Sequence, residues 1–237
     1  MALILCIDTA TMVCSVALAE NQKIIANIDS TEEKSHASQL GIYIDNLLKN
    51  AGIYLKQLDA VAISRGPGSF TGLRIGVSMA KGLCYGADIP LIAVDTLQAM
   101  AYGIVKLLKD FKPGMVNLDD SLYCPMIDAR RMEVYTAIYD FNIKPVKDTE
   151  AKIIDEDSFG GYLKTKMMFF GGDGAAKCKN LINDKNAFFL ENFAHSAIHM
   201  NSIAQDFFNA GKFEDIAYFE PYYLKNFIAT VAKRKIF

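Results

Sequence analysis

Two strand–turn–strand units, each with an aspartate after its first strand, constrain this chain more than any other feature of its sequence. The first unit has strands at residues 2–7 and 13–18, and the second has strands at residues 122–127 and 133–139. Asp8 follows the first strand of one unit, and Asp128 follows the first strand of the other. Short apolar runs of this kind are typical of buried strands. The recurrence predicts a fold built from two related halves.

The elements after each unit are expected to follow one order, β-β-β-α-β-α, with one more strand and helix closing each half. In the first half they are strands at 23–28, 60–64 and 91–94 and helices at 39–51, 70–85 and 97–108. A segment with Pro113-Gly114, at 110–121, is typical of a linker. In the second half, shorter strands are expected at 149–154, 167–170 and 187–190, with helices at 155–163, after 171–174 and at 196–208.

This element order resembles the duplicated α/β fold of actin, sugar kinases and the Hsp70 ATPase, which is RNase H-like. In that fold two N-terminal hairpins hold nucleotide phosphates between the lobes. Turn amides and short hydroxyls donate to the phosphate oxygens, and the aspartate binds the metal or its waters. We therefore expect a first lobe at residues 1–110, with 215–237 packing back on it, and a second, smaller lobe at 111–214.

Composition limits the classes of function. Of the 237 residues, 51% are hydrophobic and 22% are charged, so the chain can bury a substantial core. The formal net charge of −2 gives no general attraction for polyanions, so the chain alone is not expected to hold a nucleic acid. The cysteines are scattered, no apolar run is long enough to span a bilayer, and the N-terminus lacks the features of a signal peptide. We expect a cytoplasmic protein without membrane association.

The first turn, residues 8–11, has the residue types of a phosphate-binding hairpin. An ordinary hairpin, in which Asp8 and Thr9 bond to their own backbone, explains it equally well. The second turn carries Arg130 and Arg131 where a phosphate hairpin needs glycine and small residues. Since phosphoryl transfer depends on positioning, independent ATP hydrolysis is expected to be weak or absent. The predicted remnants of a nucleotide site are Asp8, Thr9, Thr11 and Asp128.

Residues 65–76 form the most distinctive stretch, a glycine-rich turn that opens a helix. No Gly-Lys-Ser/Thr sequence follows, which excludes a Walker A loop. Thr71 stands where a dinucleotide fingerprint needs its third glycine, and Pro67 removes one amide. This mismatch disfavours a dinucleotide-binding oxidoreductase.

The helix that this stretch opens carries interior glycines, each of which costs about 1 kcal/mol relative to alanine. Small residues spaced four apart let another backbone approach closely. That backbone can belong to the chain's own sheet or to a partner. Since apolar residues cover two faces of this helix, we expect it and the preceding helix to form a subunit contact. The predicted partner interface is Leu40, Tyr43, Ile44, Leu47, Phe70, Gly72, Leu73, Gly76, Met79 and Leu83.

Other candidate sites carry less weight. His195 and His199 have a spacing that can bind zinc on a helix, but no acidic residue completes a ligand set, so two polar residues at a helix start are the favoured interpretation. No serine-nucleophile elbow is present. The aromatic segment 218–226 is expected to pack on the body of the protein rather than on nucleic acid. The sequence predicts no catalytic residue and no metal site.

Several blocks of the sequence resemble the TsaB (YeaZ) family. They lie at residues 5–11 with 14–18, at 65–76, at 127–130 with 133–135, and at 220–225. The second block, Arg-Gly-Pro-Gly-Ser-Phe-Thr-Gly-Leu-Arg-Ile-Gly, is highly specific. The blocks keep the family's order across nearly the whole chain, and residues 144–193 match least well.

The resemblance implies an actin-like fold and a non-catalytic subunit of the bacterial complex that transfers threonylcarbamoyl to an adenosine of tRNA. Such a subunit binds and activates TsaD, the transferase, and pairs with TsaD and the ATPase TsaE through the helices at 39–51 and 70–85. It forms a homodimer when alone and meets tRNA only through the complex, while ATP or ADP and metal are bound in the partner subunits. No histidine follows Val94 until His195, so the H-x-x-x-H metal motif of TsaD is missing.

Alternatives stay open at this point. An actin-fold ATPase or kinase would use Asp8, Thr11 and Asp128, and residual ATPase activity is left open. Arg130 and Arg131 could contact tRNA, a partner acid or nothing. We expect the self-association surface and the TsaD surface to overlap, because one apolar helix pair must serve both.

Overall fold

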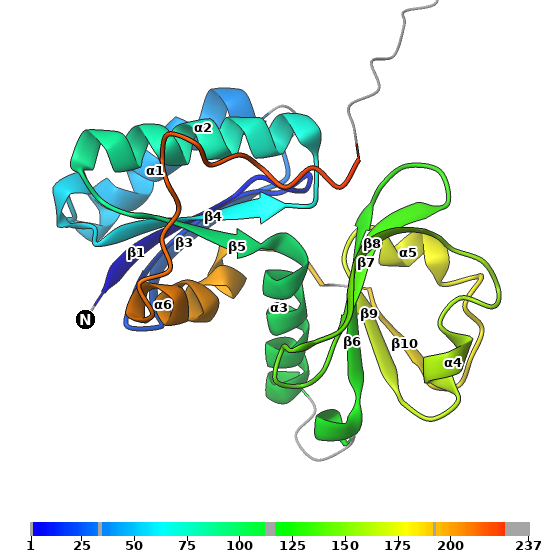
Figure 1. Cartoon of the computed structure of the whole chain (residues 1–237). Helices are drawn as coiled ribbons and strands as arrows, with labels where there is room; N and C mark the ends of the chain where they lie inside the picture. The colour runs from blue at the N-terminus through cyan, green and yellow to red at the C-terminus, as the bar shows by residue number, and fades with distance from the viewer. Residues whose placement is uncertain (1, 33–34, 112–116, 192, 226–237) are drawn as a thin grey trace, which may run out of the picture.

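The computed structural model describes residues 2–32, 35–111, 117–191 and 193–225, and it divides into two lobes (Figure 1). The first lobe has a sheet of five strands, β1 (Leu3–Asp8), β2 (Cys14–Glu20), β3 (Lys23–Ser30), β4 (Ala60–Gly66) and β5 (Leu91–Asp95), in the order β3-β2-β1-β4-β5. β1 is central, and it pairs antiparallel with β2 and parallel with β4. It is buried on both faces, which explains its continuous apolar sequence.

The second lobe repeats this topology. Its strands are β6 (Leu122–Asp128), β7 (Glu133–Tyr139), β8 (Pro145–Ile153), β9 (Met168–Gly171) and β10 (Ala187–Leu190), in the order β10-β9-β6-β7-β8. β6 takes the place of β1, since it pairs antiparallel with β7 and parallel with β9. The two strands that end in aspartate therefore occupy equivalent central positions.

Helices cover both faces of each sheet (Figure 1). The helices are α1 (Ser35–Ala51), α2 (Phe70–Ala87), α3 (Thr96–Phe111), α4 (Gly160–Leu163), α5 (Ala175–Cys178) and α6 (Asn201–Asn209), with short 3-10 turns at Leu55–Gln57, Leu118–Asp120 and Ala197–Met200. α1 and α2 cover one face of the first sheet, and α4 and α5 lie on one face of the second.

The remaining two long helices are exchanged between the lobes. α3 follows the first sheet in sequence but packs mainly on β6 of the second, whereas α6 follows the second sheet and packs on β1 and β5 of the first. The sequence placed α3 in the segment 1–110 and α6 in the segment 111–214, and element order gives no sign of this exchange. The exchange ties the lobes together through their cores.

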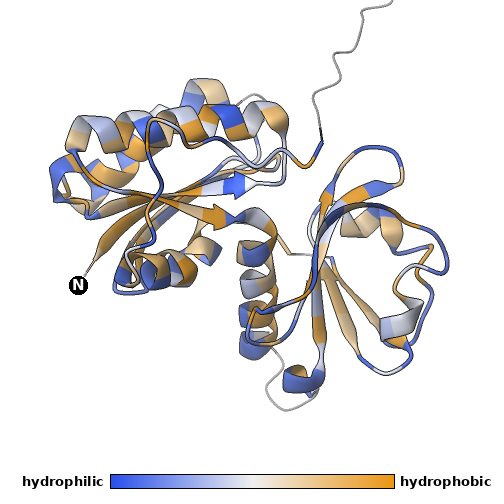
Figure 2. Ribbon diagram, viewed as in Figure 1, coloured by the Kyte–Doolittle hydropathy of each residue, from blue (hydrophilic) through white to orange (hydrophobic). Residues whose placement is uncertain are grey.

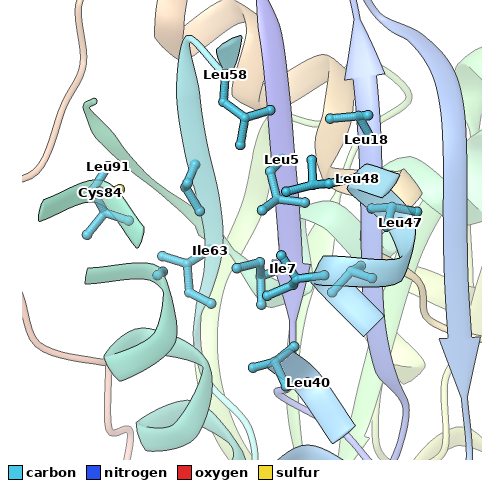
Figure 3. Packing of buried hydrophobic residues seen from close by; sticks show 14 of the residues in the cluster. Leu5, Ile7, Leu18, Leu40, Leu47, Leu48, Leu58, Ile63, Cys84 and Leu91 are labelled. Carbon is cyan, nitrogen blue, oxygen red and sulfur yellow. The ribbon is translucent and has the colours of Figure 1, made fainter. Parts of the chain in front are cut away.

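The largest hydrophobic core lies between the first sheet and the α1–α2 pair. Leu5 and Ile7 of β1, Ile63 of β4 and Leu40 and Leu47 of α1 meet there with their side chains fully or almost fully buried (Figure 3). Apolar residues concentrate on the strands, while polar residues occupy the outer parts of helices and loops (Figure 2). Each Å² of apolar surface that is removed from water contributes about 25 cal/mol to stability, so this cluster is a main source of the lobe's stability.

The chain returns to the first lobe through residues 212–225, which we call the C-terminal strap. It passes over α2 and contains one turn, at residues 216–218 (Figure 1). Its backbone is held at both ends, since Glu214 N donates to Leu91 O at 2.9 Å and Tyr222 N donates to Arg65 O at 2.7 Å. Between these points Lys81 Nζ donates to the carbonyl of Phe219. Residues 226–237 of the predicted return segment lie outside the described residues.

The largest differences from the expected elements lie in the second lobe, whereas in the first lobe α1 begins earlier than expected, at Ser35. The strand expected at 149–154 begins earlier, at Pro145, and the helix expected at 155–163 is reduced to Gly160–Leu163. Neighbouring glycines explain the shortness of that helix, because glycine is a poor helix former. In the part of the chain that the structure describes, no helix has the length and hydrophobicity that crossing a bilayer requires.

Two glycines of α2 should respond in opposite ways to alanine. A Cβ on Gly76 would lie 2.2 Å from Thr9 Oγ1, whereas a Cβ on Gly82 would meet nothing within 4 Å. We expect Gly76→Ala to lower the free energy of unfolding by about 1–3 kcal/mol, because the packed turn has to move. We expect Gly82→Ala to raise it by about 0.5–1 kcal/mol through helix propensity. Urea unfolding of both variants tests this, and equal effects would contradict the contact between α2 and the turn.

Candidate functional site

Asp8, the predicted metal-binding aspartate of the first hairpin, is fully buried and is paired with a histidine of the same chain. Its Oδ2 lies 2.5 Å from His195 Nε2, and the two side chains are 1% and 3% exposed. Its other oxygen, Oδ1, accepts a hydrogen bond of 2.9 Å from Ala10 N. Burial, followed by the charge of Asp8, raises the pKa of the neighbouring Cys6 thiol to about 12. Because His195 Nε2 lies against Asp8 Oδ2, the imidazole occupies the position beside Asp8 that a metal ion would need.

The two histidines of the 195–199 spacing do not form a metal site. His199 stacks on Phe193 with ring centroids 5.4 Å apart, and its ring centroid is 6.0 Å from that of His195. Burial, then the neighbouring His195 and Lys106, lowers the pKa of His199 to about 3, so its ring is neutral in the folded protein. Among the described residues, no three His, Cys, Asp or Glu side chains lie close enough together to hold a metal ion.

The hydroxyls of the first turn are also used internally. Thr9 is completely buried, and its Oγ1 donates to Gly72 O at 2.8 Å. A Cβ on Gly72 would lie 2.0 Å from Thr9 O, so only glycine permits this approach of α2. Thr11 is 8% exposed, and its Oγ1 accepts from Val13 N at 3.2 Å. α2 therefore lies directly against the turn where a phosphate-binding hairpin would present its donors.

The second hairpin has a cation of its own. Lys177 Nζ is ion-paired with Asp128 Oδ1 and also donates to Arg131 O at 2.7 Å. Arg130 and Arg131 have positive φ angles of 69° and 52°, and Arg130 N donates to the Asp128 carboxylate at 2.7 Å. Asp173 accepts from Asp128 N, and burial raises the pKa of the Asp173 carboxyl. The turn is closed by its own side chains and holds both arginine side chains at the surface.

The four predicted nucleotide-site residues therefore fall into two separate, internally bonded turns. Asp8 of the first lobe has His195 Nε2 within ion-pair distance, and Asp128 of the second lobe has Lys177 Nζ within the same range. In an actin-type site the corresponding oxygens face a metal and phosphates across the cleft. Here both carboxylate oxygens of Asp8 and Oδ1 of Asp128 are bonded within the chain, and these bonds hold the two hairpins.

The residues of the predicted partner interface lie largely on the inner side of α1 and α2. Leu40, Ile44, Leu47, Gly72, Leu73 and Gly76 are buried. Tyr43, Met79 and Leu83 are half-buried against the core, and Phe70 is half-buried against Tyr223. The six buried positions contribute to the core of this chain, whereas Met79 and Leu83 also reach the outer side of α2. A partner contact by the helix pair itself stays a prediction.

The outer side of the same helices carries an open apolar groove with a volume of about 570 Å³. It is lined by Ala37, Arg74, Ile75, Ser78, Met79, Gly82 and Leu83. A Cβ on Gly82 would meet open space, and Gly41, also exposed, has only Met79 Cε nearby, at 3.5 Å. Small residues here serve no internal packing, in contrast to Gly72 and Gly76. They let another helix approach the backbone closely.

Sequence reasoning missed residues of two features, the buried pairing of Asp8 with His195 and the outer groove of α1 and α2. His195 lies far from Asp8 in sequence and shows no local signal of this pairing. Ala37, Ser78 and Gly82 have low hydrophobicity and were not selected by an apolar stripe. Their spacing is the signal that was available, because Ser78 and Gly82 are four residues apart on one face of α2.

Comparisons with known proteins agree with the fold and the distinctive blocks. The family model "TsaD: tRNA N6-adenosine threonylcarbamoyltransferase" matches residues 23–232. The TsaB protein of Haemophilus influenzae is 42% identical over 104 residues, 44% of either chain. That of Escherichia coli is 40% identical over 136 residues, 57% of this chain and 54% of the relative. The chain thus matches about half the length of these curated relatives.

A crystal structure of a protein similar to YeaZ, from Pseudomonas aeruginosa, has the same fold. The TM-score is 0.80 at 24% identity, and the match covers 95% of this chain and 100% of the other. Together with the two mixed five-stranded sheets, this confirms the predicted α/β, actin-like fold class.

The neutral, buried His199 should make the protein acid-sensitive. Its pKa is about 3 in the folded protein against 6.5 ordinarily. Between these values the unfolded chain binds a proton that the folded chain does not, so stability is retained above pH 6.5 and falls as the pH drops towards 3. We expect His199→Leu to flatten this fall by at most about 1.4 kcal/mol per pH unit. Urea unfolding between about pH 7 and pH 4 measures it, and parallel curves for wild type and variant would contradict it.

Proposed function

The chain belongs to the TsaD family, and from this premise we propose that it is a non-catalytic partner subunit in the biosynthesis of threonylcarbamoyladenosine in tRNA. The family model covers most of the chain, and the curated relatives above are named for this pathway. In the proposed role the chain binds the transferase TsaD and holds it in an active conformation. The same proposal includes contacts with TsaE, contact with tRNA only through the complex, and self-association in the absence of TsaD.

The observation that carries the non-catalytic part of the proposal is the buried pair of Asp8 and His195. A nucleotide-dependent enzyme of this fold needs a free carboxylate at the end of β1 for its metal. Leaving a buried hydrogen-bonding group without its partner costs about 1–3 kcal/mol, so an incoming cation would have to offset a loss of this kind. His195 of the same chain therefore occupies the Asp8 carboxylate, which would otherwise be the main ligand of the nucleotide-bound metal.

The outer groove of α1 and α2 supports a role in protein–protein contact. Its lining is mostly apolar or small, and the described part of the chain leaves it open. Met79 and Leu83 extend from the core into the groove, so a partner seated there would continue the hydrophobic cluster of the first lobe. α2 is anchored through Gly72 and Thr9 to the first hairpin, which gives the groove a rigid base. A rigid, partly formed surface reduces the entropy that binding has to overcome.

A bulky charged residue in the groove should abolish the TsaD contact without unfolding the chain. Gly82→Arg places its side chain in open space on the outer side of α2. We expect it to weaken binding to TsaD from the same organism by at least about thirtyfold. Titration calorimetry of the purified proteins measures the affinity, and circular dichroism verifies that the helix content is unchanged.

Gly160→Arg is the matched control, because a Cβ at Gly160 also meets nothing within 4 Å but lies on α4 in the second lobe. It should bind TsaD as the wild type does. If Gly82→Arg also binds as the wild type does, the outer groove of α1 and α2 is not the TsaD surface.

A further inference from the structure

Arg74 is an exposed cation held in a fixed orientation at the rim of the outer groove. Its Cζ lies 4.2 Å from the centroid of the Phe70 ring, and its Nε donates to Tyr223 Oη at 3.2 Å. The two aromatic rings are themselves in contact, with centroids 4.7 Å apart. Stacking and the hydrogen bond fix the plane of the guanidinium group, which is usually mobile at a protein surface.

The charge of Arg74 is unmatched within the described chain. No Asp or Glu of the described residues lies within ion-pair distance of it, whereas the comparable Arg65 is paired with Asp95 at 2.7 Å. The Arg74 side chain lines the groove, and none of the other lining residues is acidic. An oriented arginine without an internal carboxylate, beside an apolar groove, is suited to forming a bidentate pair with a carboxylate that arrives from outside.

We propose that Arg74 is the specificity-determining residue of the groove, and that it pairs with a carboxylate on an apolar helix of a different protein. A helix fits because Ala37, Ser78 and Gly82 allow close approach of a backbone along the space between α1 and α2. Deepening the function proposed above, and resting on it, this inference assigns the carboxylate to the transferase subunit.

A second copy of the chain does not satisfy the same chemistry. In a two-fold symmetric dimer a surface meets itself, so each groove would face the same lining residues. That lining contributes Arg74 and no carboxylate, so the lining of one copy offers no acidic partner to Arg74 of the other. Self-association through this face would therefore rest on apolar contact alone. Arg74 therefore favours binding of the transferase over binding of a second copy where both compete for the same groove.

The C-terminal strap supplies the residue that positions Arg74. Tyr223 lies in the strap, whose backbone is fixed beside it by the hydrogen bond from Tyr222 N to Arg65 O, 2.7 Å long. Tyr223 is thus a positioning residue, and the strap is part of the partner surface even though it does not line the groove.

The test measures two affinities for each variant, for TsaD by titration calorimetry and for self-association by sedimentation equilibrium. Arg74→Met keeps the length and apolar stem of the side chain and removes its charge. We expect it to weaken TsaD binding at least about tenfold, with a flatter dependence on salt, and to leave self-association within about twofold of wild type. Tyr223→Phe should weaken TsaD binding by about two- to fivefold, since only the positioning hydroxyl is lost.

Three results would overturn the inference. In the first, Arg74→Met binds TsaD with wild-type affinity while Gly82→Arg does not, so the groove is the TsaD surface but Arg74 is not its determinant. In the second, Arg74→Met weakens self-association as much as TsaD binding, which removes the discrimination. In the third, Gly82→Arg and Arg74→Met both bind as the wild type does, and this result rejects the proposed function of the groove together with the inference.

Discussion

The buried hydrogen bond between Asp8 and His195 is the constraint on which the rest of the structure depends. It joins the end of the central strand of the first sheet to the segment that brings the chain back from the second lobe, just before α6 packs on that sheet. A buried polar group that loses its hydrogen-bond partner keeps the cost of its desolvation, so a change of either residue alone is expected to lower the stability of the fold. The same pairing closes the corner where a related enzyme would bind its metal. One interaction therefore fixes the return path of the chain and engages the aspartate at the end of β1.

A second close contact joins this closed corner to α2, the helix that lines the outer groove. Gly72 and Gly76 bring α2 directly onto Thr9 of the first turn, so there is no room for a side chain at these two positions. The outer side, with Ser78 and Gly82, remains open and lies beside α1. The hairpin that would hold phosphates in an enzyme of this fold here serves as the rigid support of a groove. Under the proposed function, the packing that closes this corner also supports the partner surface.

The sequence predicted the two-lobed fold well because its strands are short apolar runs and its helices have clear periodicity. It could not predict the pairing of Asp8 with His195 or the exchange of α3 and α6, since both depend on contacts between distant parts of the chain. Apolar stripes such as Leu40, Ile44 and Leu47 identified the core side of α1 rather than a partner surface. The open groove is marked by small residues, and glycines with internal and external roles look alike in sequence. Only the space around each Cβ separates Gly76 from Gly82.

Equilibrium titration of ATP with Mg²⁺ into the purified chain distinguishes a nucleotide corner occupied by the chain's own side chains from one that is free for a ligand. We expect no saturable binding up to about millimolar ATP, because Asp8, Thr9 and Asp128 are already bonded within the chain. A dissociation constant of about micromolar size that is lost in Asp8→Asn would contradict this expectation. It would show that Asp8 is available to a metal and would favour an actin-fold ATPase or kinase.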